Sequence, residues 1–250
     1  MSQHEMNSEK PIDQYRRRLL GGSVAALAGL TIAPGVFLQT VQARPADEPA
    51  TDRNRWGLLI DINKCVDGCN KCVTACNDEN GIRPMHGPET DSQWIRIVKA
   101  RSKSTRHEFQ MPVMCQHCAN PPCADVCPTG ASFKRADGIV LVDRHICIGC
   151  RYCMMACPYK ARSLVHGKVT DQKPYMPRGK GTVEACTLCV HKVDRGDGTT
   201  ACAEACPEGA ILFGDLNDAN SEISKRLEQY GGRQLRANLS LNTGVRYQGL

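Results

Sequence analysis

The chain has 250 residues, a formal net charge of +6 and only 5% aromatic residues. The length suits one or two domains. The weak positive charge, without a clustered basic face or stacking aromatic residues, excludes the common nucleic-acid-binding classes, so we expect no nucleic-acid partner.

The first 43 residues follow the order of an export signal. Arg16-Arg17-Arg18-Leu19-Leu20 precedes a mildly apolar stretch at 21–41, and Val41-Gln42-Ala43 offers the small residues of a cleavage site. The arginine pair matches a twin-arginine signal, which predicts a periplasmic protein. The alternative is an uncleaved membrane anchor, because the stretch is long enough to span a bilayer, although Pro34 weakens it.

Three elements are expected before the middle of the chain. After a polar linker at 44–55, Trp56 to Asp61 predicts a strand that enters the first group of cysteines. Residues 77–92 are rich in glycine and proline and predict a loop. Gln93 to Lys99 alternates between polar and apolar residues and predicts a second strand.

Two local signals follow. Ala136-Asp137-Gly138 lies between two short runs, of which the second is Ile139 to Val142, and this pattern predicts a β-hairpin. Ser221 and Gly231 bracket Glu222 to Tyr230, which predicts a short capped helix. The remainder is polar and contains no apolar run long enough to cross a membrane.

The 16 cysteines form four groups of four. The groups are Cys65/Cys69/Cys72/Cys76, Cys115/Cys118/Cys123/Cys127, Cys147/Cys150/Cys153/Cys157 and Cys186/Cys189/Cys202/Cys206. The third group has the C-x2-C-x2-C-x3-C-P spacing of bacterial two-cluster ferredoxins. Thiolates are soft ligands that suit iron–sulfur sites, so the count predicts four [4Fe–4S] clusters. Clusters in the interior would explain the low aromatic content.

In two-cluster ferredoxins, the fourth cysteine of each run binds the other cluster. This rule predicts two ligand sets in the middle of the chain, and we extend the same crossing to the outer groups. We name each set by its first cysteine. The sets are the Cys65 set (Cys65, Cys69, Cys72, Cys206), the Cys76 set (Cys76, Cys186, Cys189, Cys202), the Cys115 set (Cys115, Cys118, Cys123, Cys157) and the Cys127 set (Cys127, Cys147, Cys150, Cys153).

The first group departs from the common pattern. Three residues separate Cys65 from Cys69, and Asn77 follows Cys76 where the other groups have proline after their last cysteine. Gly68 is expected to absorb the extra residue, because glycine adopts unusual φ values without strain.

The cysteines could also serve three other purposes: disulfide bonds, a zinc site or attachment of haem. An exported, cysteine-rich chain is normally a disulfide scaffold, but cysteines three apart within one turn are poorly placed to pair. The fourth group alone also resembles a zinc ribbon. Attachment of c-type haem needs C-x-x-C-H, and no group has it.

Several residues near the cysteines have two interpretations. His117 and His191 either donate hydrogen bonds to cluster sulfides or are ordinary buried or solvated histidines. Four basic residues either offset the charge of a cluster or form a solvated face. These four are Lys134, Arg135, Arg151 and Arg162.

Over residues 56–215 the layout resembles the four-cluster, ferredoxin-like electron-transfer subunits of membrane redox complexes. The run from Cys115 to Pro128, CQHCANPPCADVCP, is typical of that family. Residues 132–140 and 150–162 are most similar to the DsrO family, the periplasmic iron–sulfur subunits of the sulfite-reduction-associated DsrMKJOP complex.

The resemblance implies an electron-transfer subunit in dissimilatory sulfur metabolism, without catalytic residues of its own. It also implies two partners, an NrfD/DsrP-type multi-pass membrane subunit that interacts with quinone and a periplasmic cytochrome c. The alternative is the electron-transfer beta subunit of a periplasmic molybdopterin oxidoreductase of the polysulfide or tetrathionate type. No nucleophile–base pair or phosphate-binding loop indicates an enzyme.

The predicted fold class is α+β, with tandem bacterial two-[4Fe–4S] ferredoxin-like domains, small antiparallel hairpins and an N-terminal export signal. The middle groups would form a domain inserted into an outer one. The expected boundaries are 1–43 for the signal, 44–110 and 171–215 for the outer domain, 111–170 for the inserted domain and 216–250 for a C-terminal extension.

Overall fold

The computed structural model describes residues 49–87, 89–101 and 106–250. The predicted export signal lies outside these residues. The helices are α2 (Lys71–Glu79), α3 (Pro122–Asp125), α4 (Tyr152–Ala156), α5 (Val190–Arg195), α6 (Ala201–Glu204) and α7 (Glu222–Tyr230), with 3-10 turns η1 (Ile62–Lys64) and η2 (Ala237–Leu239). The strands are β1 (Trp56–Asp61), β2 (Ile95–Arg101), β3 (Glu108–Met114), β4 (Ser132–Lys134), β5 (Val140–Val142), β6 (Ser163–Leu164), β7 (Val183–Glu184), β8 (Ile211–Asp215) and β9 (Val245–Gln248).

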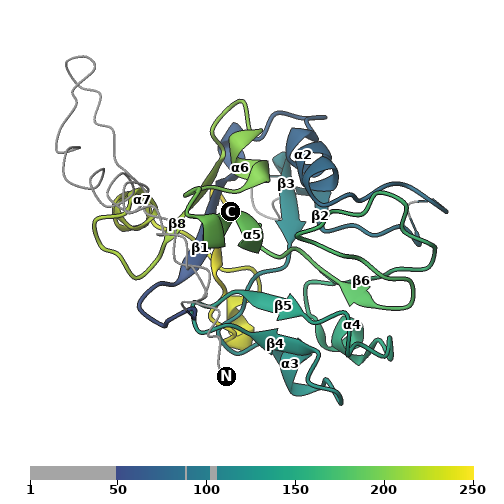
Figure 1. Cartoon of the computed structure of the whole chain (residues 1–250). Helices are drawn as coiled ribbons and strands as arrows, with labels where there is room; N and C mark the ends of the chain where they lie inside the picture. The colour runs from purple at the N-terminus through teal and green to yellow at the C-terminus, as the bar shows by residue number, and fades with distance from the viewer. Residues whose placement is uncertain (1–48, 88, 102–105) are drawn as a thin grey trace, which may run out of the picture. The chain divides into compact units, whose positions relative to one another are not determined.

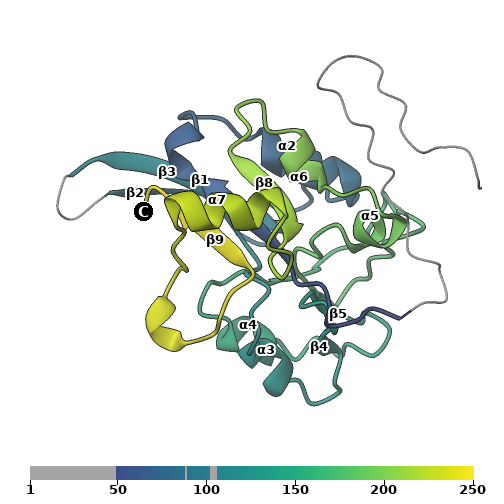
Figure 2. The same ribbon diagram turned by 90° about the vertical axis from the view of Figure 1, so that its left-hand side faces the viewer.

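The largest sheet among the described residues has three strands in the order β8-β1-β9. The predicted strand β1 is confirmed, and its residues Leu58, Leu59 and Ile60 are all buried. It pairs antiparallel with β8 and parallel with β9. Helix α7 packs against β8 and β1 (Figures 1 and 2). Because β1 is covered on both faces, its apolar run is continuous rather than alternating.

Strand β9 was not predicted, and it shows that the end of the chain is part of the fold. Val245 and Tyr247 are fully buried on one face of the strand. The hydroxyl of Tyr247 donates a hydrogen bond to the backbone oxygen of Pro112, 3.1 Å away. The polar segment after residue 230 therefore supplies a core strand to the same sheet as β1.

Two boundaries differ from those predicted. Strand β2 begins at Ile95, two residues later than expected, and it pairs along its whole length with β3. The expectation of a loop from residue 77 was wrong, because α2 continues to Glu79. The Asn80 backbone N–H and side chain both donate to the Cys76 oxygen. Gly81, with φ +62°, then ends the helix.

The predicted hairpin is confirmed by the pairing of β4 with β5. Gly138 has φ +86° in the turn, a conformation that glycine adopts without strain. In Figure 1 this hairpin lies beside α3 and α4. Strands β6 and β7 form a further short ladder that joins this middle part to the fourth cysteine group. The small sheets and short helices agree with an α+β class.

Helix α7 is confirmed with both predicted caps. The Ser221 hydroxyl accepts a hydrogen bond from the Ser224 N–H at 3.2 Å, and Gly231 ends the helix with φ +69°.

Among the residues described, no helix has the length and apolar character needed to cross a bilayer.

Replacing Ser221 with alanine is expected to destabilise α7 by about 1 kcal/mol, because the first turn loses its capping acceptor. Hydrogen exchange of the amides in the first turn of α7 measures this change locally. Ser221→Asp retains an acceptor and serves as the control. Equal exchange rates in the alanine variant and the original chain would show that the cap contributes nothing.

Candidate iron–sulfur centres

All 16 cysteines lie among the described residues, and each has an unpaired thiol. The chain is therefore not folded as a disulfide scaffold. The thiols instead gather in four places, and each place contains the four members of one predicted set.

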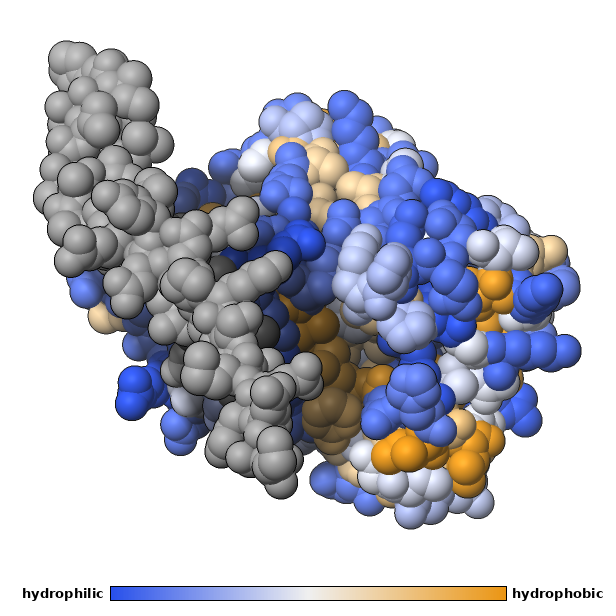
Figure 3. Space-filling model, viewed as in Figure 1, coloured by the Kyte–Doolittle hydropathy of each residue, from blue (hydrophilic) through white to orange (hydrophobic). Residues whose placement is uncertain are grey.

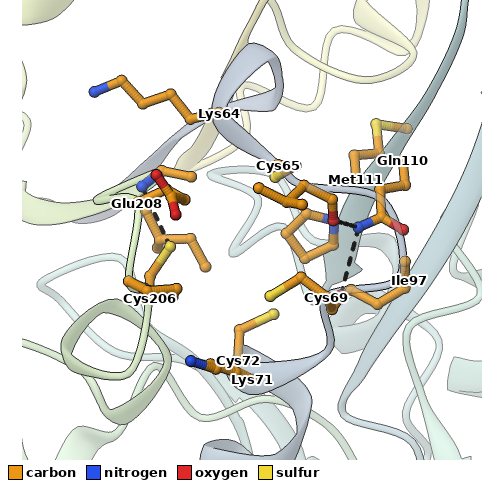
Figure 4. Close-up of a pocket in the computed structure, with 15 residues that line it drawn as sticks. Lys64, Cys65, Cys69, Lys71, Cys72, Ile97, Gln110, Met111, Cys206 and Glu208 are labelled. Atoms are coloured by element: carbon orange, nitrogen blue, oxygen red, sulfur yellow. Dashed lines mark hydrogen bonds between the residues drawn. The ribbon is translucent and has the colours of Figure 1, made fainter.

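The Cys65 set lines one cavity, together with Gln110, Pro112 and Ile211. Figure 4 shows Cys206, which precedes β8, facing Cys69 and Cys72 across this space. The longer loop between Cys65 and Cys69 turns at Gly68, which has φ +77°. The side chain of Gln110 on β3 holds the loop, since it accepts from the Gly68 N–H at 3.1 Å and donates to the Val66 oxygen.

The Cys76 set lines a second cavity, whose walls include Leu58, Trp94 and Leu188. All four thiols are buried. Burial raises the pKa of the Cys189 thiol to about 12. Cys206 lines the other cavity, so the fourth cysteine group does not converge on one site as a zinc ribbon would.

The Cys127 set lines a third cavity, together with Thr129, Ser132 and Val183. Two backbone N–H groups donate to its sulfurs, Ser132 to Cys127 and Val183 to Cys147, each at 3.4 Å. Cys127, Cys147 and Cys150 are partly exposed. Strand β7, which carries Val183, thus contacts a site whose cysteines come from earlier parts of the chain.

The Cys115 set is buried at all four positions. Burial, together with the nearby Cys123 and Cys157 thiols, raises the pKa of the Cys118 thiol to about 12. This mutual effect places cysteines of two different groups in one site. The guanidinium of Arg162 donates to the Cys123 sulfur at 3.0 Å.

These sites fit an iron–sulfur group that accepts hydrogen bonds. Several buried donors at the sites have no partner among the described residues. They are the hydroxyls of Ser132 and Thr187, Nη1 of Arg162 and Nε2 of His117. Within the same residues, no three histidine, cysteine or acidic side chains close around a point as the ligands of one metal ion do.

The two histidines have different surroundings. His117 is buried and its Nδ1 accepts from the Val140 N–H at 3.0 Å. Burial lowers the pKa of His117 to about 3, so the ring is neutral and carries its proton on Nε2. His191 instead hydrogen-bonds Glu79 at 2.6 Å and stacks on Tyr175, with ring centroids 4.2 Å apart. Its Nε2 is thus occupied by a carboxylate.

The four basic candidates near the cysteines also differ in their surroundings. Arg135 is held by Asp137 and Asp194, and Lys134 donates to the Ala119 oxygen. Arg151 is exposed. Arg162 is buried and, among the described hydrogen bonds, is the one of the four that reaches a thiol.

Comparison with known proteins agrees with this arrangement. One family of 4Fe-4S dicluster domains matches residues 106–216, and a second matches residues 64–131. Together with the 16 cysteines, two such domains account for four [4Fe–4S] clusters.

Relatives match over most of the chain. It is 39% identical over 261 residues to the Hdr-like menaquinol oxidoreductase iron-sulfur subunit 1 of Archaeoglobus fulgidus, covering 93% of this chain and 97% of that protein. It is 34% identical to the B subunit of tetrathionate reductase from Salmonella typhimurium, covering 88% and 81% of the two chains. It is 38% identical to NrfC of Escherichia coli, covering 70% and 72%. The chain therefore belongs to the family of electron-transfer iron–sulfur subunits with 4Fe-4S dicluster domains.

Proposed function

We propose that this chain relays electrons in a membrane-bound complex of dissimilatory sulfur metabolism, as a subunit of the DsrO type. The observation that carries this proposal is the near-complete alignment with a protein named as an iron-sulfur subunit of a menaquinol oxidoreductase. The proposed partners are an NrfD/DsrP-type membrane subunit, which exchanges electrons with quinone, and a periplasmic cytochrome c. The predicted twin-arginine signal supports a periplasmic location.

We propose that each of the four thiol sets holds one cluster. The bound clusters would supply one-electron chemistry, over a range of potentials of roughly −700 to +450 mV for such groups. The chain itself would perform no substrate chemistry. Its residues would supply ligands, exclude water and donate hydrogen bonds to the sulfurs, the usual division between protein and cofactor.

Exposure divides the four sets into two kinds. In the Cys65 and Cys127 sets three thiols of four are partly exposed, whereas the Cys76 and Cys115 sets are buried throughout. A redox partner needs a ligand set near the surface. The two partly exposed sets are therefore the proposed contact points for partners, and the buried sets would connect them through the protein.

The surface around the Cys127 set suits a partner with an apolar face. Ile148, Tyr152 and Met155 are 66%, 54% and 65% exposed, next to Cys147, Cys150 and Cys153 in the chain. Figure 3 shows apolar side chains gathered over the region where Figure 1 places α4. Contiguous exposed apolar patches mark protein or membrane contacts. We assign this face to the membrane partner.

Iron analysis of anaerobically purified protein tests the cofactor content. Four [4Fe–4S] clusters predict roughly 16 iron per chain, with coupled paramagnetic signals on reduction. An iron content below about 12 would contradict full occupancy by such clusters.

Purification from native membranes tests the complex. Recovery with an NrfD/DsrP-type protein and a cytochrome c supports the DsrO-type assembly. The second candidate, a beta subunit of a molybdopterin oxidoreductase, is favoured by the similarity to the tetrathionate reductase protein. A large pterin-containing subunit in place of the cytochrome would establish that candidate instead.

A further inference from the structure

Arg162 occupies an unusual position for a charged residue. It lies between Cys157 and strand β6, and only 5% of it is exposed. Its Nη2 donates to the Cys123 sulfur at 3.0 Å, and its buried Nη1 has no hydrogen-bond partner among the described residues. No ion pair joins Arg162 to a carboxylate within that part of the chain. Because an unpaired buried charge is costly, a negative partner has to come from elsewhere.

The thiols supply that partner once they are deprotonated. The Arg162 side chain already hydrogen-bonds to the Cys123 sulfur. It also hydrogen-bonds to the Cys153 thiol. Cys123 belongs to the Cys115 set and Cys153 to the Cys127 set. One guanidinium therefore acts on ligands of both middle sites.

We propose that Arg162 sets the reduction potentials of both middle clusters, through a fixed positive charge held between the Cys123 and Cys153 ligands. This inference rests on the ligand sets proposed above. Each cluster takes up one electron on reduction and becomes more negative. A nearby cation stabilises the more negative form, so the potentials of these two clusters are raised. Arginine holds its donors in a rigid planar fork, whereas the ammonium of lysine is a compact point charge on a flexible stem.

The test is an anaerobic redox titration with dithionite, followed by electron paramagnetic resonance. In Arg162→Met, the affinity for the electron should fall at least tenfold at two of the four clusters. A tenfold change is about 59 mV for a one-electron couple. The potentials of the other two clusters should not move. Arg162→Lys keeps the charge and should show a smaller shift than the methionine variant.

Arg226 on α7 supplies the matched control. It forms an ion pair with Glu222 at 3.8 Å, and Arg226→Met removes the same charge from the chain. In Arg226→Met, the reduction potentials of all four clusters should equal those of the unmodified protein. A uniform shift in both variants would show a general charge effect and overturn the proposal.

Other outcomes are equally decisive. Four unchanged potentials in a fully loaded Arg162→Met protein would overturn the proposal. If Arg162→Met loses iron, the Arg162→Lys variant decides. A lower iron content in Arg162→Lys, with unshifted potentials in the clusters that remain, would show that Arg162 has a purely structural role. Failure of the ligand sets themselves is recognised separately, from an unmodified protein with fewer than about 12 iron.

Discussion

Replacing Cys157 with serine is expected to remove the same cluster as replacing Cys123 with serine. The two cysteines lie in different groups, 34 positions apart, but the structure places both in the buried Cys115 set. Serine offers a hard oxygen in place of a soft thiolate, which iron–sulfur sites disfavour. Each variant should lose about four of roughly 16 iron and the same paramagnetic signal.

Cys153→Ser is the matched control for this experiment. Cys153 lies in the same group as Cys157 but in the Cys127 set. Its substitution should remove a different signal and leave the one lost in the other two variants. If Cys157→Ser and Cys153→Ser instead lose the same signal, each group binds its own cluster and the crossed assignment is wrong.

The parts of the fold that the sequence could predict are those with local causes. The β4–β5 hairpin follows from Asp137-Gly138, and α7 from Ser221 and Gly231. Each signal acts within a few residues of the element that it forms. Strand β1 was also predictable, because a continuous apolar run is typical of a strand covered on both faces.

Two missed strands lack a clear local signal. Strand β9 pairs with β1 from the far end of the chain, with Val245 opposite Leu58. Its alternation covers only four residues, too few to predict a strand by themselves. Strand β3 contains Pro112 opposite Ile97, and proline within a run argues against a strand unless it lies at an edge. In both cases the tertiary partner decides the structure.

The candidate site also has a part that the sequence could predict and a part that it could not. Cysteine spacing predicts which residues meet, because the ferredoxin rule is itself a geometric rule. The sequence left the roles of Arg162 and Arg135 open, since both are basic residues close to cysteines. The structure separates them through distant residues: Asp194 pairs with Arg135, whereas Arg162 has a thiol as its partner.

Replacing Glu184 with glutamine is expected to cost about 3–5 kcal/mol of stability, because it leaves the Arg178 charge buried without its counterion. The two side chains are 0% and 2% exposed and meet through hydrogen bonds of 2.9 and 2.6 Å.

This ion pair also joins separate parts of the fold. Arg178 donates to the Gly81 oxygen after α2, and Glu184 on β7 follows Val183, the donor to Cys147. Anaerobic urea titrations of fully iron-loaded protein, followed by visible absorption, measure the loss. The double variant Arg178→Met/Glu184→Met is the control. It should be more stable than Glu184→Gln, since replacing both charges with apolar groups avoids the unpaired ion. A single variant as stable as the unmodified chain would show that water reaches Arg178 and that the pair does not hold β7 against the end of α2.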